Sequence, residues 1–260
     1  MMRALYIAKT GMDASQFQLD VVSNNLANVN TIGFKRSRGV FEELYYQTLR
    51  QPGGQLANGS TLPSGLQIGT GAAAVATARI HAQGIPTQTT QPLDMQIDGD
   101  GFFRVQLPNG TTAYTRDGEF QRNANGDVVT AMGYPMNPNI NIPANATQIT
   151  VSTAGVVQYT LPGATAPQTA GTILLTTFIN PQGLDSTGGN LYLQTAASGD
   201  PQDGDAQTDN RGSIRSGFLE MSNVNVTEEL VNMITAQRSF EMNSRAVTTA
   251  DQMLQKLSNL

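Results

Sequence analysis

The side chains that could perform acid–base or nucleophilic chemistry are few in this sequence of 260 residues. His81 is the only imidazole, and the chain contains no Cys. No Gly-x-Ser-x-Gly motif provides a serine nucleophile, and no Ser or Asp is placed beside His81 by the sequence. No pair of carboxylates stands out either. We therefore interpret His81 as a structural or surface residue and predict no catalytic residue.

One glycine-rich segment, Gly69–Ala74, matches the Gly-x-Gly-x-x-Ala pattern of dinucleotide sites. Such a site needs a strand–helix–strand unit and an acidic residue about 20 positions later. The next acidic residue is Asp94, and Pro86 and Pro92 would break a helix before it. The pattern therefore predicts no nucleotide site.

Two acidic segments resemble cation sites only superficially. Asp94 and Asp98 could begin a calcium loop, but the twelfth position is Val105, where a bidentate Glu is needed. We interpret Asp98–Gly101 as a β-hairpin turn. Four further carboxylates read as a solvated acidic loop: Asp200, Asp203, Asp205 and Asp209. We predict no metal and no cofactor.

The composition is polar but poor in charge. Charged residues make up 13% of the chain, about half of the usual ~25%. With 15 Lys and Arg and a net charge of -5, the chain is not expected to bind nucleic acid. A weakly charged surface suits a subunit that packs against copies of itself, because buried unpaired charge is costly. A β-rich extracellular protein is an alternative interpretation.

The sequence contains no segment with the pattern of a membrane-spanning helix or of a cleavable secretory signal. Its longest run of small apolar residues, 71–78, is far shorter than the ~20 residues of a spanning helix. Arg3 precedes any apolar run, and Asp13 follows soon after. We therefore expect neither a cleavable secretory signal nor insertion into a membrane.

The first 30 residues carry a heptad pattern. Apolar or small residues alternate at steps of three and four, at Leu5, Ala8, Met12, Ser15, Leu19, Val22, Leu26 and Val29. This spacing predicts a long helix over about 3–29. Gly33 lies just beyond it, where a left-handed residue often ends a helix.

A second heptad pattern occupies the other end of the chain, over about 226–258. Its first seam consists of Val226, Met233, Phe240, Val247 and Leu254. The second seam is expected at Leu230, Gln237, Ser244 and Asp251 and is mostly polar. Asn225 or Thr227 is a suitable N-cap.

Neither helix is expected to be stable alone. Burial of five seam residues contributes about 8–15 kcal/mol, whereas ordering roughly 30 residues costs about 1–2 kcal/mol each for the backbone. We therefore expect the two helices to pair and to need further neighbours from other chains.

The region between the helices, about 34–220, has the pattern of a β-rich domain. Strands are predicted at 101–107, 148–151, 172–178 and 190–193, and turns at 108–110, 117–118, 125–127 and 188–190. Residues 50–70 and 198–212 are expected to be extended loops. This spacing favours antiparallel sheets.

Four asparagines lie within seven residues at the end of the first helix. Asn side chains compete for backbone hydrogen bonds there, so the cluster either forms specific amide contacts between subunits or simply ends the helix. The segment around them, residues 24–35, reads NNLANVNTIGFK. It resembles the N-terminal signature of the flagellar rod and hook proteins. Residues 220–234, EMSNVNVTEELVNMI, and 236–241, AQRSFE, resemble the C-terminal end of the same family.

Two central motifs resemble the rod members of that family, at the distal part of the rod. They are residues 62–71, LPSGLQIGTG, and the pair GFF at 101–103 with YTRDG at 114–118. The resemblance implies a non-enzymatic subunit that assembles helically into a rigid hollow drive shaft across the periplasm and transmits torque from motor to hook. It also implies export through the flagellar type III apparatus. The partners implied are further copies of the chain, proximal rod proteins, the hook protein and the rod-surrounding ring proteins.

The fold class predicted is α+β, with N- and C-terminal axial helices pairing as a coiled-coil-like domain and an antiparallel β-rich central region. The domains expected are 1–33 with 221–260 as the helical axial core, 34–75 as a rod-specific connecting segment, and 76–220 as the β-rich outer domain. The resemblance implies that the connecting segment braces neighbouring subunits.

The subunit interface is predicted to use residues from both ends of the chain and from the connecting segment. They are Leu5, Met12, Leu19, Val22, Asn24, Asn25, Leu26, Asn28, Gly33, Phe34, Leu62, Pro63, Leu66, Val226, Leu230, Met233, Phe240, Val247 and Leu254. Two alternatives stay open: a hook or proximal rod protein, and a β-rich ligand-binding or enzymatic domain with helical tethers.

Overall fold

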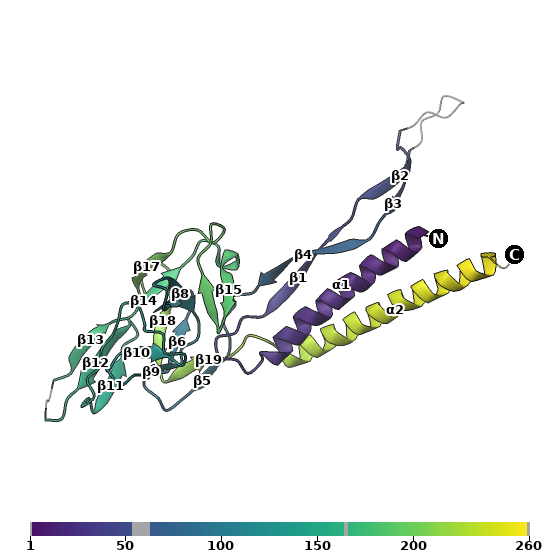
Figure 1. Ribbon diagram of the computed structural model, residues 1–260. Helices are drawn as coiled ribbons and strands as arrows, with labels where there is room; N and C mark the ends of the chain where they lie inside the picture. The colour runs from purple at the N-terminus through teal and green to yellow at the C-terminus, as the bar shows by residue number, and fades with distance from the viewer. Residues whose placement is uncertain (1, 54–62, 164–165, 259–260) are drawn as a thin grey trace. The chain divides into compact units, whose positions relative to one another are not determined.

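The computed structural model describes residues 2–53, 63–163 and 166–258 (Figure 1). The chain divides into two compact units. Unit 1 contains residues 1–27, 37–78 and 225–260, and unit 2 contains residues 28–36 and 79–224. The predicted α+β class is confirmed, because helices occupy the two ends of the chain and an antiparallel β-rich region lies between them.

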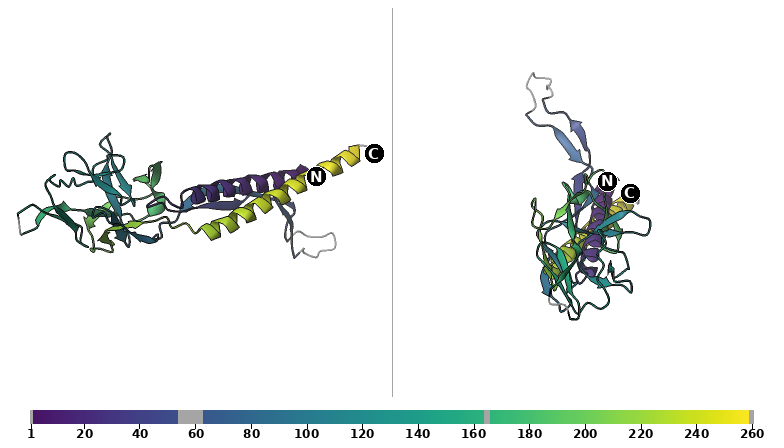
Figure 2. Two further views of the ribbon diagram at one scale, coloured as in Figure 1. Left: turned by 90° about the horizontal axis from the view of Figure 1, so that it is seen from below. Right: turned by 90° about the vertical axis from the view of Figure 1, so that its left-hand side faces the viewer.

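Unit 1 is built on two long helices, α1 (Met2–Ala27) and α2 (Val226–Ser258). They lie side by side and run antiparallel, so that the start of α1 lies beside the later turns of α2 (Figures 1 and 2). Asn225 caps α2, because its Oδ1 accepts a hydrogen bond from the Thr227 backbone nitrogen at 3.0 Å. Within the described residues, no helix is both long and apolar enough to cross a membrane.

Two antiparallel ribbons complete unit 1. The first pairs β1 (Ser37–Glu43) with β4 (Ala72–Arg79), and the second pairs β2 (Tyr46–Arg50) with β3 (Leu66–Gly69). The prediction of a loop over residues 50–70 is therefore wrong at its C-terminal end, where β3 forms. Backbone pairing with β2 extends this segment.

Unit 2 contains the remaining strands. Their bounds are β5 (Pro86–Gln88), β6 (Met95–Asp98), β7 (Phe102–Gln106), β8 (Thr112–Thr115), β9 (Phe120–Arg122), β10 (Val128–Thr130), β11 (Gln148–Val151), β12 (Val156–Thr160), β13 (Gln168–Thr172), β14 (Leu174–Thr177), β15 (Asp185–Gly188), β16 (Leu191–Leu193), β17 (Gln202–Asp205), β18 (Ser213–Ser216) and β19 (Phe218–Glu220), with a short 3-10 helix at Pro181–Gly183.

The largest sheet of unit 2 has six strands in the order β15-β16-β8-β7-β14-β17. A three-stranded sheet, β11-β12-β13, and the pairs β9–β10, β6–β18 and β5–β19 surround it. The main core is aliphatic and aromatic, and includes Met95, Ile97, Phe103, Val105, Ile140, Ile142, Ile173, Leu175 and Ile214. The pairs β5–β19 and β6–β18 join the beginning of unit 2 to its end.

The predicted turns are confirmed at three places. Residues 108–110, 125–127 and 188–190 join the paired strands β7–β8, β9–β10 and β15–β16. Residues 117–118 instead join β8 to β9, which belong to different sheets. The hairpin expected at Asp98–Gly101 is wrong: β6 pairs with β18, whereas β7 pairs with β8 and β14, so this turn passes between two sheets.

The loop expected over residues 198–212 is wrong in part, because it contains β17. This strand reads Gln-Asp-Gly-Asp, a sequence with little intrinsic preference for a strand. Asp203 anchors it to its neighbours, because its carboxylate accepts hydrogen bonds from Arg104 Nη1 at 2.6 Å and from Thr176 Oγ1 at 2.5 Å. Side chains on β7 and β14 therefore add to the backbone pairing of β17 with β14.

Candidate assembly surface and buried ion cluster

The contact between α1 and α2 is fixed by polar groups as well as apolar ones. Asn25 of α1 donates from Nδ2 to Glu229 Oε2 of α2 at 3.2 Å. The same Nδ2 donates to the Ser37 carbonyl at 2.8 Å, and Asn25 Oδ1 accepts from the Ser37 nitrogen at 2.9 Å. Asn25 is 1% exposed and Glu229 2% exposed. One buried amide thus connects both helices and the start of β1.

Gly11 marks a second close approach of the two helices. A Cβ at this position would lie 2.7 Å from Nδ2 of Asn243 on α2. Glycine inside a helix costs about 1 kcal/mol relative to alanine. Its presence in the middle of α1 is explained by the Asn243 side chain that occupies the space beside it.

The seam of α2 that faces α1 lies one position earlier in the sequence than the predicted second seam. The predicted second seam contained Leu230 and Gln237, but Leu230 is 43% exposed and Gln237 is exposed. The preceding positions are the sheltered ones, with Glu229 and Ala236 buried and Asn243 and Ala250 half-buried. Since Glu229 and Asn243 are polar, apolar periodicity could not identify them.

The first turns of α2 carry apolar side chains that are exposed to solvent. Val226, Leu230 and Ile234 follow one another at four-residue steps, and Val231 lies beside Ile234 on the adjoining part of the helix surface. All four are exposed. We call these four residues the α2 apolar face. An exposed apolar cluster of this kind usually marks an interaction site.

The predicted interface residues fall into three groups. Val22, Asn25 and Gly33 are buried within the chain itself. The half-buried residues are Leu5, Met12, Leu19, Leu26, Asn28, Phe34, Met233, Val247 and Leu254. The exposed residues are Asn24, Pro63, Leu66, Val226, Leu230 and Phe240. Leu62 lies outside the described residues. The structure thus gives the first group partners inside the chain.

The second ribbon of unit 1 also presents large side chains to solvent. Tyr45 is 93% exposed, and Tyr46, Leu49 and Leu66 are each about half exposed. Tyr46 Oη donates to Glu43 Oε2 at 2.8 Å, which raises the pKa of the phenol. Strands β2 and β3 therefore offer apolar and aromatic surface on a narrow two-stranded element.

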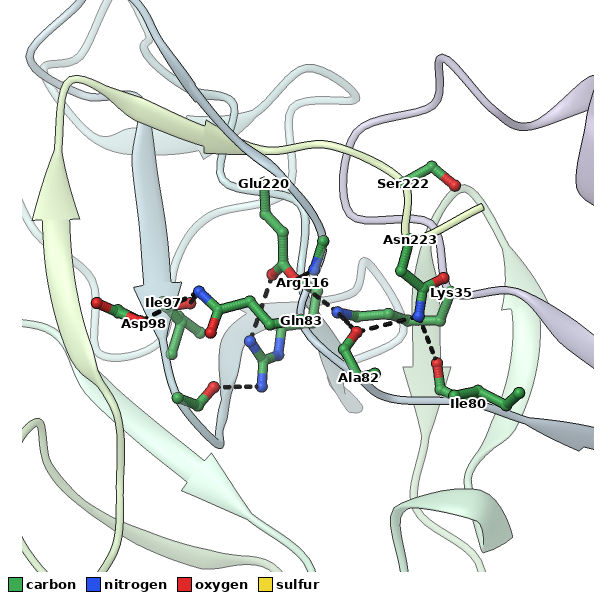
Figure 3. Close-up of polar contacts among 12 residues, drawn as sticks. Lys35, Ile80, Ala82, Gln83, Ile97, Asp98, Arg116, Glu220, Ser222 and Asn223 are labelled. Carbon is green, nitrogen blue, oxygen red and sulfur yellow. Dashed lines mark hydrogen bonds and ion pairs between the residues drawn. The ribbon is translucent and has the colours of Figure 1, made fainter. Parts of the chain in front are cut away.

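Unit 2 buries an ion cluster that consists of Lys35, Arg116 and Glu220 (Figure 3). Lys35 Nζ donates to Glu220 Oε1 at 2.6 Å, and Arg116 Nη1 donates to Glu220 Oε2 at 3.3 Å. All three residues are at most 4% exposed. Burial lowers the pKa of Lys35, and the nearby Glu220 carboxylate opposes this effect. Two cations share one carboxylate away from water.

Neutral groups make the further hydrogen bonds of this cluster, whereas Arg116 Nε is buried without a partner among the described residues. Lys35 Nζ also donates to the Ala82 carbonyl at 2.8 Å, and Arg116 Nη2 donates to the Gly99 carbonyl at 2.8 Å. The Gly84 nitrogen donates to Glu220 Oε1 at 2.7 Å. Sequence analysis missed this cluster. Its signal in the sequence is limited to Lys35, the single charged residue of the motif at 24–35, and Glu220, the first residue of the motif at 220–234.

His81 lies close to the ion cluster, on a cavity of about 280 Å³ that Phe102, Phe178 and Arg116 also line. Its ring makes edge contacts with Phe102 and Tyr192, whose ring centroids lie 5.6 and 5.8 Å away. Burial, followed by the positive charges of Lys35 and Arg116, lowers the pKa of His81 to about 4. The imidazole is therefore neutral at pH 7 and serves as an aromatic packing group.

Comparison with known proteins places this architecture in one class. Residues 5–35 match the family described as flagella basal body rod protein, residues 96–159 match the flagellar hook protein FlgE/F/G D1 domain, and residues 215–260 match the flagellar basal body rod FlgEFG protein C-terminal family. Helical ends around a β-rich centre, with these three matches, define a flagellar rod- and hook-type protein.

Full-length relatives define the particular family. The chain is 52% identical to the flagellar basal-body rod protein FlgG of Buchnera aphidicola subsp. Acyrthosiphon pisum, over all of both chains. It is 47% identical to the FlgG of Caulobacter vibrioides and 42% identical to that of Bacillus subtilis, over 100% of this chain and 99% of each relative. The chain belongs to the FlgG family of flagellar basal-body rod proteins. It is a structural protein of the flagellar basal body.

Proposed function

We propose that the chain polymerises helically into the distal rod, where it forms a rigid hollow shaft that transmits torque from motor to hook. Its work is mechanical and not enzymatic. The single observation that carries this proposal is the α2 apolar face, which is exposed although it begins one of the two long helices. Further copies of the chain would bury it.

The magnitude of this burial is enough to favour association. Val226, Leu230, Val231 and Ile234 are 42%, 43%, 57% and 50% exposed. Burial of a whole aliphatic side chain contributes about 1.5–3 kcal/mol, so covering the remaining half of four side chains contributes roughly 3–6 kcal/mol per subunit. Each subunit in a helical array can use such a face together with its other surfaces.

The remaining predicted interface residues enter this proposal in different roles. Leu5, Met12, Leu19, Leu26, Met233, Phe240, Val247 and Leu254 are assigned to helix packing in the axial layer, and Asn24, Asn28, Phe34, Leu62, Pro63 and Leu66 to contacts between neighbours. Val22, Asn25 and Gly33 hold the subunit's own fold. The three-part organisation with boundaries at 33, 75 and 220 belongs to this proposal as well.

The partners and the route follow from the same proposal. The assembled chain would meet proximal rod proteins at one end, the hook protein at the other and ring proteins around its outside, after export by the flagellar type III apparatus. Low charge supports close packing of many copies, because few side chains would be buried without a counter-charge.

The test is polymerisation of the purified full chain, followed by light scattering and electron microscopy. We expect straight, stiff tubes from the natural sequence and none from Ile234→Glu, because a buried unpaired carboxylate costs several kcal/mol. Met132→Glu, which adds the same charge to an exposed apolar residue of unit 2, is the matched control and should polymerise. Normal tubes from Ile234→Glu would reject the proposed face, and flexible curved tubes from the natural chain would favour the hook alternative.

A further inference from the structure

Three segments that are distant in the sequence meet at Glu220 of unit 2. The Gly33 nitrogen donates to the Glu220 carbonyl oxygen at 2.7 Å, and the Met221 nitrogen donates to the Ile85 carbonyl at 2.9 Å. The carboxylate holds Lys35 from the first segment and the Gly84 nitrogen from the second. Residues 33–36, 80–85 and 217–223 therefore form one junction (Figure 3).

Asn223 ties the same segments a second time. Its Nδ2 donates to the Ile80 and Ala82 carbonyls at 2.9 and 3.0 Å, and its Oδ1 accepts from the Arg36 nitrogen at 2.8 Å. The Ile80 nitrogen in turn donates to the Arg36 carbonyl at 2.9 Å. The first two segments contact each other directly through this bond and through Lys35 Nζ on the Ala82 carbonyl, and the third segment supplies the Glu220 and Asn223 side chains that bond to both.

The charges at this junction do not balance without the third segment. Lys35 and Arg116 are both buried, and Glu220 is the carboxylate bonded to both. Asp100 also acts on the two cations, through space and from an exposed position. Removing Glu220 leaves two neighbouring buried cations, an arrangement that strongly destabilises a folded state.

The order of these groups along the chain determines the order in which they become available for folding. Lys35 and Arg116 precede Glu220 by 185 and 104 residues. The strands β18 and β19, which pair with β6 and β5, lie immediately before or at Glu220. A chain made from its N-terminus therefore contains both cations and both unpaired strands long before it contains the carboxylate.

We propose that Lys35, Arg116 and Glu220 form a closing clasp that makes the folding of unit 2 conditional on the arrival of its C-terminal segment. Before residue 220 is present, repulsion between the two cations and the cost of burying them oppose the docking of residues 33–36 against Arg116 and residues 80–85. When Glu220 arrives, it neutralises the pair and completes the junction in one step. The clasp thereby delays closure of unit 2 until both segments that lead to α1 and α2 are present.

The experiment uses the full chain with Glu220→Gln, a change that keeps the size of the side chain, removes its charge and replaces one of its two acceptor oxygens by an NH2 donor. We expect amide exchange to rise roughly 100-fold or more, and to rise together, in residues 33–36, 80–85 and 217–223. Because the clasp closes last, the unfolding rate should increase by about the same factor while the refolding rate stays within about threefold. Asp209→Asn, which removes the exposed carboxylate that pairs with Arg211, is the matched control and should change neither.

A second variant still tests the clasp if Glu220→Gln does not fold. The double variant Lys35→Met with Glu220→Gln removes one of the two stranded cations, and should therefore exchange at least tenfold more slowly than Glu220→Gln alone. A purely packing role for Lys35 predicts the opposite, since its loss would add to the damage. Three results would overturn the clasp: faster exchange confined to residues 217–223, a refolding rate that falls in proportion to stability, or no rescue by Lys35→Met.

Discussion

Replacing His81 with phenylalanine tests the electrostatics of unit 2 directly. The ring is half-buried against Phe102 and Tyr192, and Lys35 and Arg116 place positive charge near it. Its pKa is lowered from 6.5 to about 4, mainly by burial. Phenylalanine keeps the aromatic contacts and removes the titration, so His81→Phe isolates the effect of the proton.

The sign and size of the effect follow from linkage. Above pH 6.5 the imidazole is neutral in both states, and it contributes no pH dependence. Between pH 6.5 and 4 the His81 imidazole is protonated in the unfolded chain but not in the folded chain, so the folded state loses stability as the pH falls. Lowering the pKa of His81 from 6.5 to about 4 corresponds to about 3 kcal/mol, and the loss is complete just below pH 4.

The assay is urea unfolding at several pH values, followed by tyrosine fluorescence, because Tyr114 and Tyr192 are buried in unit 2 and the chain has no Trp. The free energy of unfolding of the natural chain minus that of His81→Phe should decrease by about 2–3 kcal/mol from pH 7 to pH 4. Carboxylates titrate in both proteins and largely cancel in this difference. A difference that stays constant over this range would refute the reasoning, since it would mean that the folded chain accepts the proton.

Two further predictions concern unit 1. Gly71→Ala should raise the critical concentration for polymerisation by about tenfold or more, because Gly71 has φ +126 and its Cβ would overlap Thr10 Oγ1 of α1; unchanged assembly would show that Gly71 can move away from α1. In the unassembled chain, amides of both terminal helices should exchange rapidly and become protected on polymerisation, because each helix buries too little alone. Strong protection of both helices before assembly would contradict this.

The helices could be predicted from the sequence because their signal is repeated many times. The seam that begins at Val226 recurs every seven residues, and the observed α2, Val226–Ser258, has the predicted bounds. The companion seam is displaced by one residue because Glu229 bonds to Asn25 of α1 and the Asn243 side chain occupies the space beside Gly11. Apolar periodicity cannot detect a polar side chain that is buried with its partner.

The candidate site could be predicted only in part, because its charged members are joined across long separations. Lys35 and Glu220 lie inside the two terminal motifs, yet nothing local connects them over 185 residues. The strand β17 escaped prediction for a related reason, since Arg104 and Thr176 on other strands hold Asp203 in place. Local preference gives the elements, whereas these contacts exist only once the topology is known.

The asparagines of the first motif show how polar and apolar residues divide the work of the chain. Asn25 satisfies its donor and acceptor groups on Ser37 and Glu229 of its own chain, so these bonds need no atom of a neighbouring subunit. Hydrogen bonds are directional, so they suit positions that must be identical in every subunit. Apolar contact is not directional, and Leu230 and Ile234 can pack against a neighbour that is not held at one exact angle. A torque-bearing polymer needs both properties: subunits with fixed internal geometry, and contacts that stay favourable under small displacements. We therefore expect substitutions at Asn25 to alter each subunit, and substitutions on the α2 apolar face to alter only the association between subunits.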